Sequence, residues 1–124
     1  MKIKVSEATN VQLDWLAGTL EKVEGLTYSE RTKKCYGYDE RKLMMRYSPT
    51  TSWAQGGEII DREKISIVWA HFHWCAGTGD IGEIYRSDEG NHFTGTGPTA
   101  LVAAMHCYVA SKLGEEVEVL DELA

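Results

Sequence analysis

Hydrophobic residues recur at helical spacing in a segment near the start of the chain. Four of them fall on one stripe: Leu13, Leu16, Leu20 and Val23. Thr9 and Gln12, which precede the stripe, match a capping box, in which each side chain accepts a hydrogen bond from the other residue's backbone N–H. This pattern predicts an amphipathic helix from residue 9 to about residue 23, with the stripe facing the core.

The opposite side of this predicted helix also carries bulky residues. Val11 and Trp15 are four positions apart, so their side chains are neighbours on the helix surface. We expect the segment 25–39, which carries three tyrosines, to cover them. The alternative is a contact surface in which Trp15 binds a partner.

A second helix is predicted for residues 98–113, the most hydrophobic continuous stretch of the chain. Gly97 suits the N-cap, Pro98 the first helical position, and Gly114 the residue that ends the helix. One side is broadly apolar: Leu101, Val102, Met105, Tyr108, Val109 and Leu113. The other side is small: Thr99, Ala100, Ala103, Ala104, Cys107, Ala110 and Ser111. A small face permits close approach, so we expect this helix either to be sandwiched within the fold or to pair with a second copy in a homo-oligomer.

Alternating apolar and polar positions predict several strands. Residues 2–5 form a short edge strand and residues 42–47 a second strand. The strongest candidate is 65–75, whose two faces are both apolar, as in a strand covered on both sides. Residues 83–86 are its expected hairpin partner, and 58–63 are either a helical turn or a strand. The predicted fold class is α+β, a small and mainly antiparallel sheet packed against two helices.

Between the second strand and residue 58 lies the polar segment 47–57, which we expect to be an irregular loop. Its tryptophan, Trp53, either anchors the loop on the core, which we favour, or belongs to a recognition surface. We expect Trp53 and Gln55 to lie near Thr99 and Ala103 at the start of the second helix. The candidate binding residues are therefore Trp53, Gln55, Thr99 and Trp15.

Length and charge narrow the class of protein. A chain of 124 residues predicts one domain covering residues 1–124. A formal net charge of −6 argues against general binding to a nucleic-acid backbone, although residues 28–46 carry six bases against three acids. Three widely spaced cysteines favour a reducing compartment, and no segment has the length or apolarity of a signal peptide or membrane span. We therefore expect a cytoplasmic protein with no membrane association.

One spacing suggests metal chemistry. His71, His73 and Cys75 alternate, which places three possible metal ligands on one face of the predicted strand. A distant carboxylate or histidine, such as His92 or His106, would have to complete the site, and no second ligand pair at metal spacing occurs. We therefore favour hydrogen-bonded structural histidines and expect no cofactor. Residues 77–82 match Gly-x-Gly-x-x-Gly, but residues 83–90 are too polar to form the helix of a dinucleotide site.

Six segments together resemble the NinX-type family of phage proteins: 4–7, 13–15, 47–50, 53–57, 97–105 and 108–114. The resemblance spans nearly the whole chain, apart from a variable middle around residues 72–93. The family is a domain of unknown function in tailed phages and prophages of enteric bacteria. The resemblance therefore implies an accessory role in the cytoplasm of an infected cell, and it supplies no catalytic residues. Ala100 and His106 stand where the family commonly has Pro and Arg, which removes a charge from the helix surface.

Two classes of function remain. The first, which we favour, is a protein-binding module that acts on a host or phage protein in the infected or lysogenic host cell. The second is a small metal-dependent or small-molecule-binding enzyme that uses His71, His73 and Cys75. Elemental analysis of untagged protein would distinguish the two.

Overall fold

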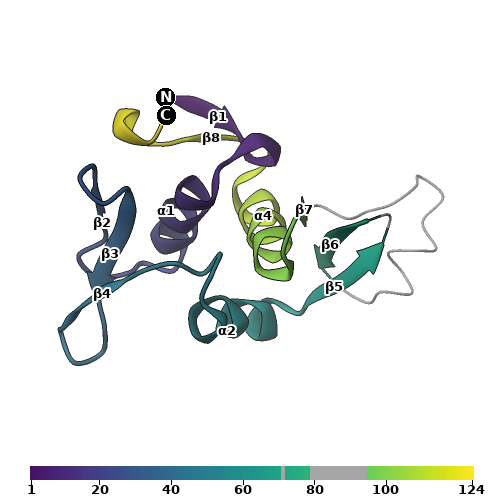
Figure 1. Ribbon diagram of the computed structural model, residues 1–124, viewed down its shortest axis with the longest axis horizontal. Helices are drawn as coiled ribbons and strands as arrows, with labels where there is room; N and C mark the ends of the chain where they lie inside the picture. Colours follow the sequence, from purple (N-terminus) through teal and green to yellow (C-terminus); the bar gives the residue numbers. More distant parts are fainter. Residues whose placement is uncertain (71, 79–94) are drawn as a thin grey trace.

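The computed structural model describes residues 1–70, 72–78 and 95–124. Within these ranges, three α-helices occupy the middle of the molecule and three small antiparallel sheets surround them (Figure 1). The described part of the chain therefore has the predicted α+β fold. The two chain ends lie together because β1 (Lys2–Lys4) pairs with β8 (Glu116–Glu118). Two short 3-10 helices, Val5–Glu7 and Asp121–Leu123, flank this sheet.

Helix α1 (Asn10–Leu20) begins with the predicted capping box. The N–H of Gln12 donates to Thr9 Oγ1 at 3.4 Å, and the N–H of Thr9 donates to Gln12 Oε1 at 2.9 Å. The helix ends before the predicted residue 23. Lys22 has a φ of 56°, in the left-handed region that a right-handed helix cannot contain.

Helix α2 (Trp53–Glu63) occupies much of the segment that we expected to be a loop. Ser52 caps it by accepting a hydrogen bond from the N–H of Gln55 at 3.3 Å. Gly56 does not form a turn. A Cβ atom on it would lie 2.4 Å from the Pro49 carbonyl oxygen and 2.7 Å from the Leu101 side chain, so this glycine lets α2 pack closely against its neighbours.

The predicted strand 65–75 is two strands, β5 (Ile65–Ala70) and β6 (His73–Thr78). They form a hairpin in which Ala70 lies opposite His73. Alternation of side chains does not reveal such a turn, because both strands continue the same period. The cross-strand pair Trp69 and Trp74 stabilises the hairpin, with ring centroids 5.5 Å apart in an edge-to-face arrangement.

The other neighbour of β6 is β7 (Gly95–Gly97). The predicted partner strand, residues 83–86, lies outside the described residues. Strand β7 rests directly on helix α4, because a Cβ atom on Gly95 would lie only 2.1 Å from the Ala103 carbonyl oxygen. The backbone of β7 thus covers the small face of that helix.

Helix α4 (Ala100–Leu113) starts two residues later than predicted. Thr99 is its N-cap and accepts a hydrogen bond from the N–H of Val102 at 3.1 Å, whereas Gly97 belongs to β7. Gly114, with a φ of 83°, ends the helix as predicted. Residues 101–109 are all buried, so the sandwiched arrangement is confirmed. Ala103, Ala104 and Cys107 of the small face are buried within the chain, and pairing with a second copy stays a prediction.

The third sheet contains β2 (Thr27–Ser29), β3 (Lys34–Tyr38) and β4 (Met44–Arg46). Its strands β2 and β3 form from the segment 25–39, which we expected to cover the outer side of α1. Val11 and Trp15 are half-buried beside this segment: the Cys35 thiol donates to the Val11 carbonyl oxygen at 3.8 Å, and Trp15 lines a hollow together with Tyr28. Strand β4 is a shorter form of the predicted strand 42–47.

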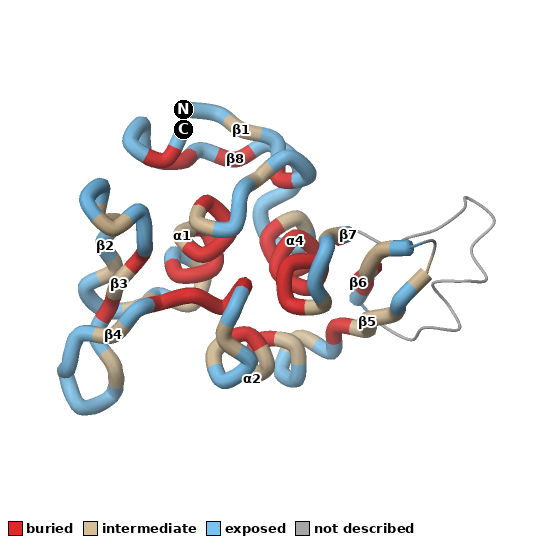
Figure 2. Tube along the Cα trace, in the orientation of Figure 1, coloured by how far each residue is buried: buried red, intermediate tan, exposed pale blue. Residues whose placement is uncertain are grey.

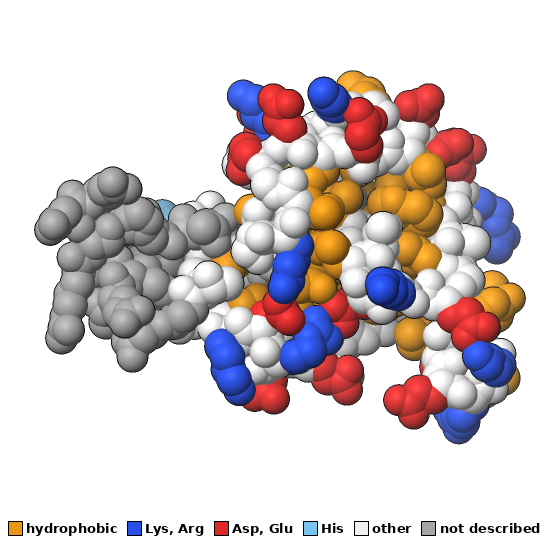
Figure 3. Space-filling model, turned by 180° about the vertical axis from the view of Figure 1, so that it is seen from behind, with side chains coloured by type: hydrophobic (Ala, Val, Ile, Leu, Met, Phe, Trp, Pro, Cys, Tyr) orange, Lys and Arg blue, Asp and Glu red, His pale blue; other side chains and the backbone are white. Residues whose placement is uncertain are grey.

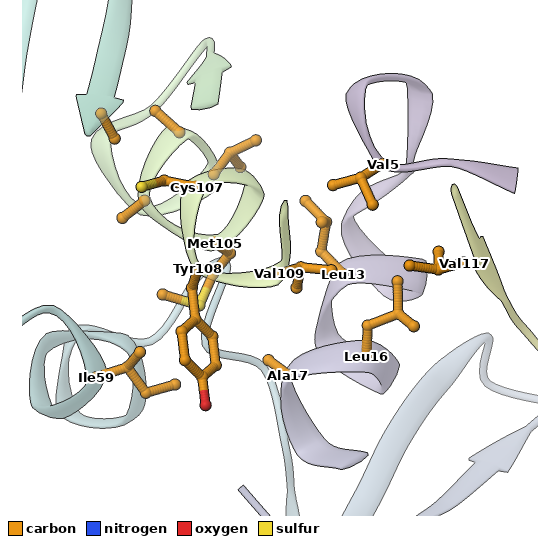
Figure 4. Packing of buried hydrophobic residues seen from close by; sticks show 14 of the residues in the cluster. Val5, Leu13, Leu16, Ala17, Ile59, Met105, Cys107, Tyr108, Val109 and Val117 are labelled. Carbon is orange, nitrogen blue, oxygen red and sulfur yellow. The ribbon is translucent and has the colours of Figure 1, made fainter. Parts of the chain in front are cut away.

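The core lies where α1, α2 and α4 meet (Figure 4). Leu13 of α1 lies beside Val109 of α4, while Ile59 of α2 lies beside Tyr108. Of the predicted stripe on α1, Leu13 and Leu16 are buried and the last two members are half-buried. Within the described residues, no helix combines the length and apolarity that a membrane span requires.

Candidate functional site

The first half of the predicted loop is buried and held by specific hydrogen bonds. Residues 47–50 run between β4 and α2 as a continuous buried stretch (Figure 2). The N–H of Thr50 donates to Asp14 Oδ1 at 3.0 Å, and the hydroxyl of Ser48 donates to Asp14 Oδ2 at 3.3 Å. A carboxylate of α1 therefore fixes the path of this segment.

Asp14 is a buried acid that our sequence-based reasoning missed. Burial raises its pKa to about 6, although hydrogen bonds from Thr50 and Ser48 and the positive charge of Arg46 oppose this rise. The sequence did offer one indication that Asp14 is buried: it directly follows Leu13 on the core-facing side of a predicted amphipathic helix. Acids at such positions are almost always bonded to something specific.

Gln55, a predicted binding residue, joins α2 to β4. Its Oε1 accepts from the N–H of Ser48 at 2.6 Å, and its Nε2 donates to the carbonyl of Arg46 at 3.0 Å. Its side chain is therefore directed to β4, whereas Gly56, the next residue of α2, lies close to Leu101 of α4. The expected position of Gln55 near Thr99 and Ala103 stays a prediction.

Trp53 begins α2 and is 60% exposed. The favoured interpretation of this tryptophan as an anchor on the core is therefore wrong. The indole lies along α2 itself, with its Cε3 atom 3.9 Å from where a Cβ atom on Gly57 would be. An exposed tryptophan fits the alternative interpretation, a recognition surface, which stays a prediction.

A groove with a volume of ≈ 580 Å³ lies between α2 and the β3–β4 hairpin. We call it the acidic groove. Four acids and one base line it: Glu21, Asp39, Glu40, Glu58 and Arg41. Its other lining residues are apolar, aromatic or amide side chains: Val23, Tyr38, Met45, Tyr47, Ala54 and Gln55. On the face shown in Figure 3, apolar side chains occupy the middle of the surface and charged side chains surround them.

The four acids of the groove have different surroundings. Burial disfavours the charge of Glu21, but hydrogen bonds from Arg62 (2.6 and 2.8 Å) and from the Tyr108 hydroxyl (2.5 Å) outweigh it, so the pKa of Glu21 is lowered. Asp39 Oδ1 accepts two backbone N–H groups within the β3–β4 turn. Glu40 and Glu58 are exposed, and neither is paired with any described residue. Two carboxylates are thus engaged in holding the fold, and two are available to a partner.

The remaining predicted binding residues lie elsewhere. Trp15 lines a different hollow together with Tyr28 and Leu120. The hydroxyl of Thr99 is used as the N-cap of α4. The structure therefore brings Trp53 and Gln55 onto one helix and does not join them with Trp15 or Thr99 at one site.

The strand predicted to carry the proposed metal ligands is a hairpin, since β5 ends at Ala70 and β6 begins at His73. His73 and Cys75 lie on β6, while His71 and His92 lie outside the described residues. Cys75 is buried, which raises its pKa and keeps the thiol neutral. Burial likewise lowers the pKa of His106. Within the described residues, no three His, Cys, Asp or Glu side chains are arranged to hold a metal ion.

Fold and site together define a small α+β protein whose candidate site is a surface groove of mixed apolar and acidic character. The family model described as Bacteriophage P22, NinX matches residues 4–112. The chain therefore belongs to the NinX family of phage proteins, as its resemblance indicated. No curated protein matches the sequence.

Proposed function

We propose that this phage protein is an accessory protein-binding module that acts in the cytoplasm of the host cell. Its acidic groove would receive a basic, partly apolar segment of a host or phage protein. The observation that carries this proposal is the lining of the groove, which combines apolar and aromatic side chains with four carboxylates and one guanidinium. Such a surface complements lysine or arginine side chains flanking an apolar residue.

Part of the lining of the groove is fixed before any partner arrives. Tyr47 is buried, and the hydrogen bonds of Gln55 hold β4 against α2 beside it. Arg62 and Glu21 further join α2 to the end of α1. A preformed surface loses less conformational entropy on binding, so more of the contact energy contributes to affinity.

The unpaired acids of the groove supply the charge that a partner would meet. Glu40 lies on the β3–β4 hairpin and Glu58 on α2, so they approach the groove from its two walls. Exposed charges of this kind mainly raise the association rate and set partner choice, and salt weakens them. Trp53, at the start of the same helix wall, offers an exposed aromatic side chain of the kind enriched in binding hot spots.

The test combines a photo-crosslinking residue with charge variants. A photoreactive side chain at Ala54, in the groove, should crosslink one protein in infected cells through a lysine- or arginine-rich peptide identified by mass spectrometry. The same group at Ser111, an exposed position on α4, should not crosslink that protein. Crosslinking of the same peptide from both positions would contradict the proposal.

The identified partner then permits a quantitative test. Glu40→Gln with Glu58→Gln should weaken its binding about tenfold at low salt, and the loss should shrink as salt is added. The matched control, Glu7→Gln with Asp61→Asn, removes two exposed acids that lie outside the groove. Equal loss in both double variants would show that net charge, and not the groove, controls binding.

A further inference from the structure

A second hollow lies beside the buried segment that contributes Tyr47 to the acidic groove. It has a volume of ≈ 320 Å³ and is bounded by the start of α1, by β3 and β4, and by residues 48–51. We call it the basic pocket, because its charged lining residues are Lys33, Lys34 and Arg46 against the single acid Asp14. This balance is opposite to that of the whole chain, whose formal net charge is −6.

The three cations of the basic pocket are not used by the fold. Within the described residues, Lys33, Lys34 and Arg46 form no ion pair with an acid. Arg46 acts on Asp14 only through its charge, because Asp14 is already bonded to segment 48–50. The cations are therefore available to an anion that enters the hollow.

The basic pocket also contains a buried hydroxyl without a partner. Thr50 is 2% exposed, and its Oγ1 makes no hydrogen bond within the described part of the chain. The Thr50 hydroxyl lies close enough to Asp14 to favour the charged form of that carboxyl group, but the two groups do not have the geometry of a hydrogen bond. A buried hydroxyl that no protein group satisfies costs stability, and at a functional site it often serves a ligand.

We propose that the basic pocket binds a small phosphate monoester. The cations and the Thr50 and Thr51 hydroxyls would hold the phosphate, because charged donors and hydroxyls together satisfy its oxygens. The volume is at the lower end for ligand pockets, which suits one phosphate and a small organic group. A polymer would need a longer basic track than this single hollow in an acidic protein. This proposal does not depend on the acidic groove.

Calorimetric titration with glycerol phosphate, inorganic phosphate and adenosine monophosphate tests the proposal. Lys34→Gln with Arg46→Gln should lower the affinity for glycerol phosphate about tenfold, since two charge-assisted contacts are lost. The control, Lys2→Gln with Lys64→Gln, removes two cations outside the pocket and should stay within about twofold of wild type. An equal loss in the control, binding of inorganic phosphate alone, or binding only of an oligonucleotide would overturn the proposal.

Thr50→Val separates a ligand-binding hydroxyl from a structural one. The valine replaces the unsatisfied hydroxyl with a methyl group of similar shape, so the free protein should melt at the same or a higher temperature. The affinity for glycerol phosphate should nevertheless fall about threefold or more. A lower melting temperature with unchanged affinity would mean that the hydroxyl serves only the fold, and the proposal would fail.

Discussion

Replacing Asp14 by Asn should remove a pH dependence that this one carboxyl gives to folding. Asn keeps an oxygen that accepts the N–H of Thr50, and its amide can donate to the Ser48 hydroxyl. Ser48 can then donate to Thr51 Oγ1, which lies 2.5 Å away. The hydrogen bonds around segment 48–51 are thus preserved while the ionisable group is lost.

The size of the effect is set by the pKa. Burial raises the pKa of Asp14 to about 6, whereas an unfolded aspartate has a pKa of about 3.9. A difference of about two corresponds to roughly 3 kcal/mol of unfolding free energy. Because the folded pKa is the higher one, this stabilisation is fully present below about pH 4 and is lost as the pH rises through about 6. The neighbouring Cys35 does not add to it, since burial and the Asp14 charge raise the thiol pKa to about 12.

The assay is urea unfolding of wild type and Asp14→Asn at several pH values between 4 and 8. The unfolding free energy of the variant minus that of the wild type should rise by roughly 3 kcal/mol across this range. Taking the difference cancels the other titrating groups, among them Glu21 and Glu115, whose lowered pKa values act in the opposite direction. Asp61→Asn, at an exposed position, is the control and should give a nearly constant difference. A constant difference for Asp14→Asn, or one that grows toward low pH, would refute the reasoning.

Three further predictions concern packing and metal content. Trp53→Ala should change the unfolding free energy by less than about 1 kcal/mol, because the indole is 60% exposed. Ile59→Ala, in the core, should lower the unfolding free energy by about 2–5 kcal/mol. Chemical unfolding of both variants and of the wild type measures these changes. Gly56→Ala should destabilise the protein by about 1–3 kcal/mol, because the new Cβ would meet the Pro49 carbonyl oxygen at 2.4 Å. Gly57→Ala, whose Cβ would have its nearest neighbour at 3.9 Å, should instead be neutral or stabilise α2, and equal melting temperatures for the two variants would contradict this. Elemental analysis of untagged protein should find no stoichiometric zinc or iron; a metal that is lost in His73→Ala would favour the enzyme alternative.

The features that sequence predicts well here are those whose signal is local. The capping box of Thr9 with Gln12 and the helix end at Gly114 each depend on a few adjacent residues, and both are confirmed. The hairpin between β5 and β6 was missed because two paired strands have the same alternation as one long strand. Local pattern also placed Trp53 wrongly, since the exposure of a side chain at the start of α2 depends on how that helix packs against the rest of the fold.

The candidate site was harder to predict for a different reason. Tyr38 and Glu58 line the same groove although twenty residues separate them, and nothing in either segment indicates the other. The basic pocket likewise joins Asp14 with residues from β3 and β4. Sequence identified Gln55 as a residue of interest, but its role in joining α2 to β4 required the positions of both elements.

The contact of β7 with α4 restricts how this sequence can change. A Cβ atom on Gly95 would lie 2.1 Å from the Ala103 carbonyl oxygen and 2.5 Å from the Cys107 backbone nitrogen. No side-chain rotation relieves such a contact, because the obstructing atoms belong to the helix backbone. Residue 95 therefore tolerates no side chain while α4 stays in place. The close contact with β7 also limits the size of the side chains at positions 103 and 107. In a saturation library selected for folded protein, these three positions should be among the most depleted, even though none of them lines the groove or the pocket.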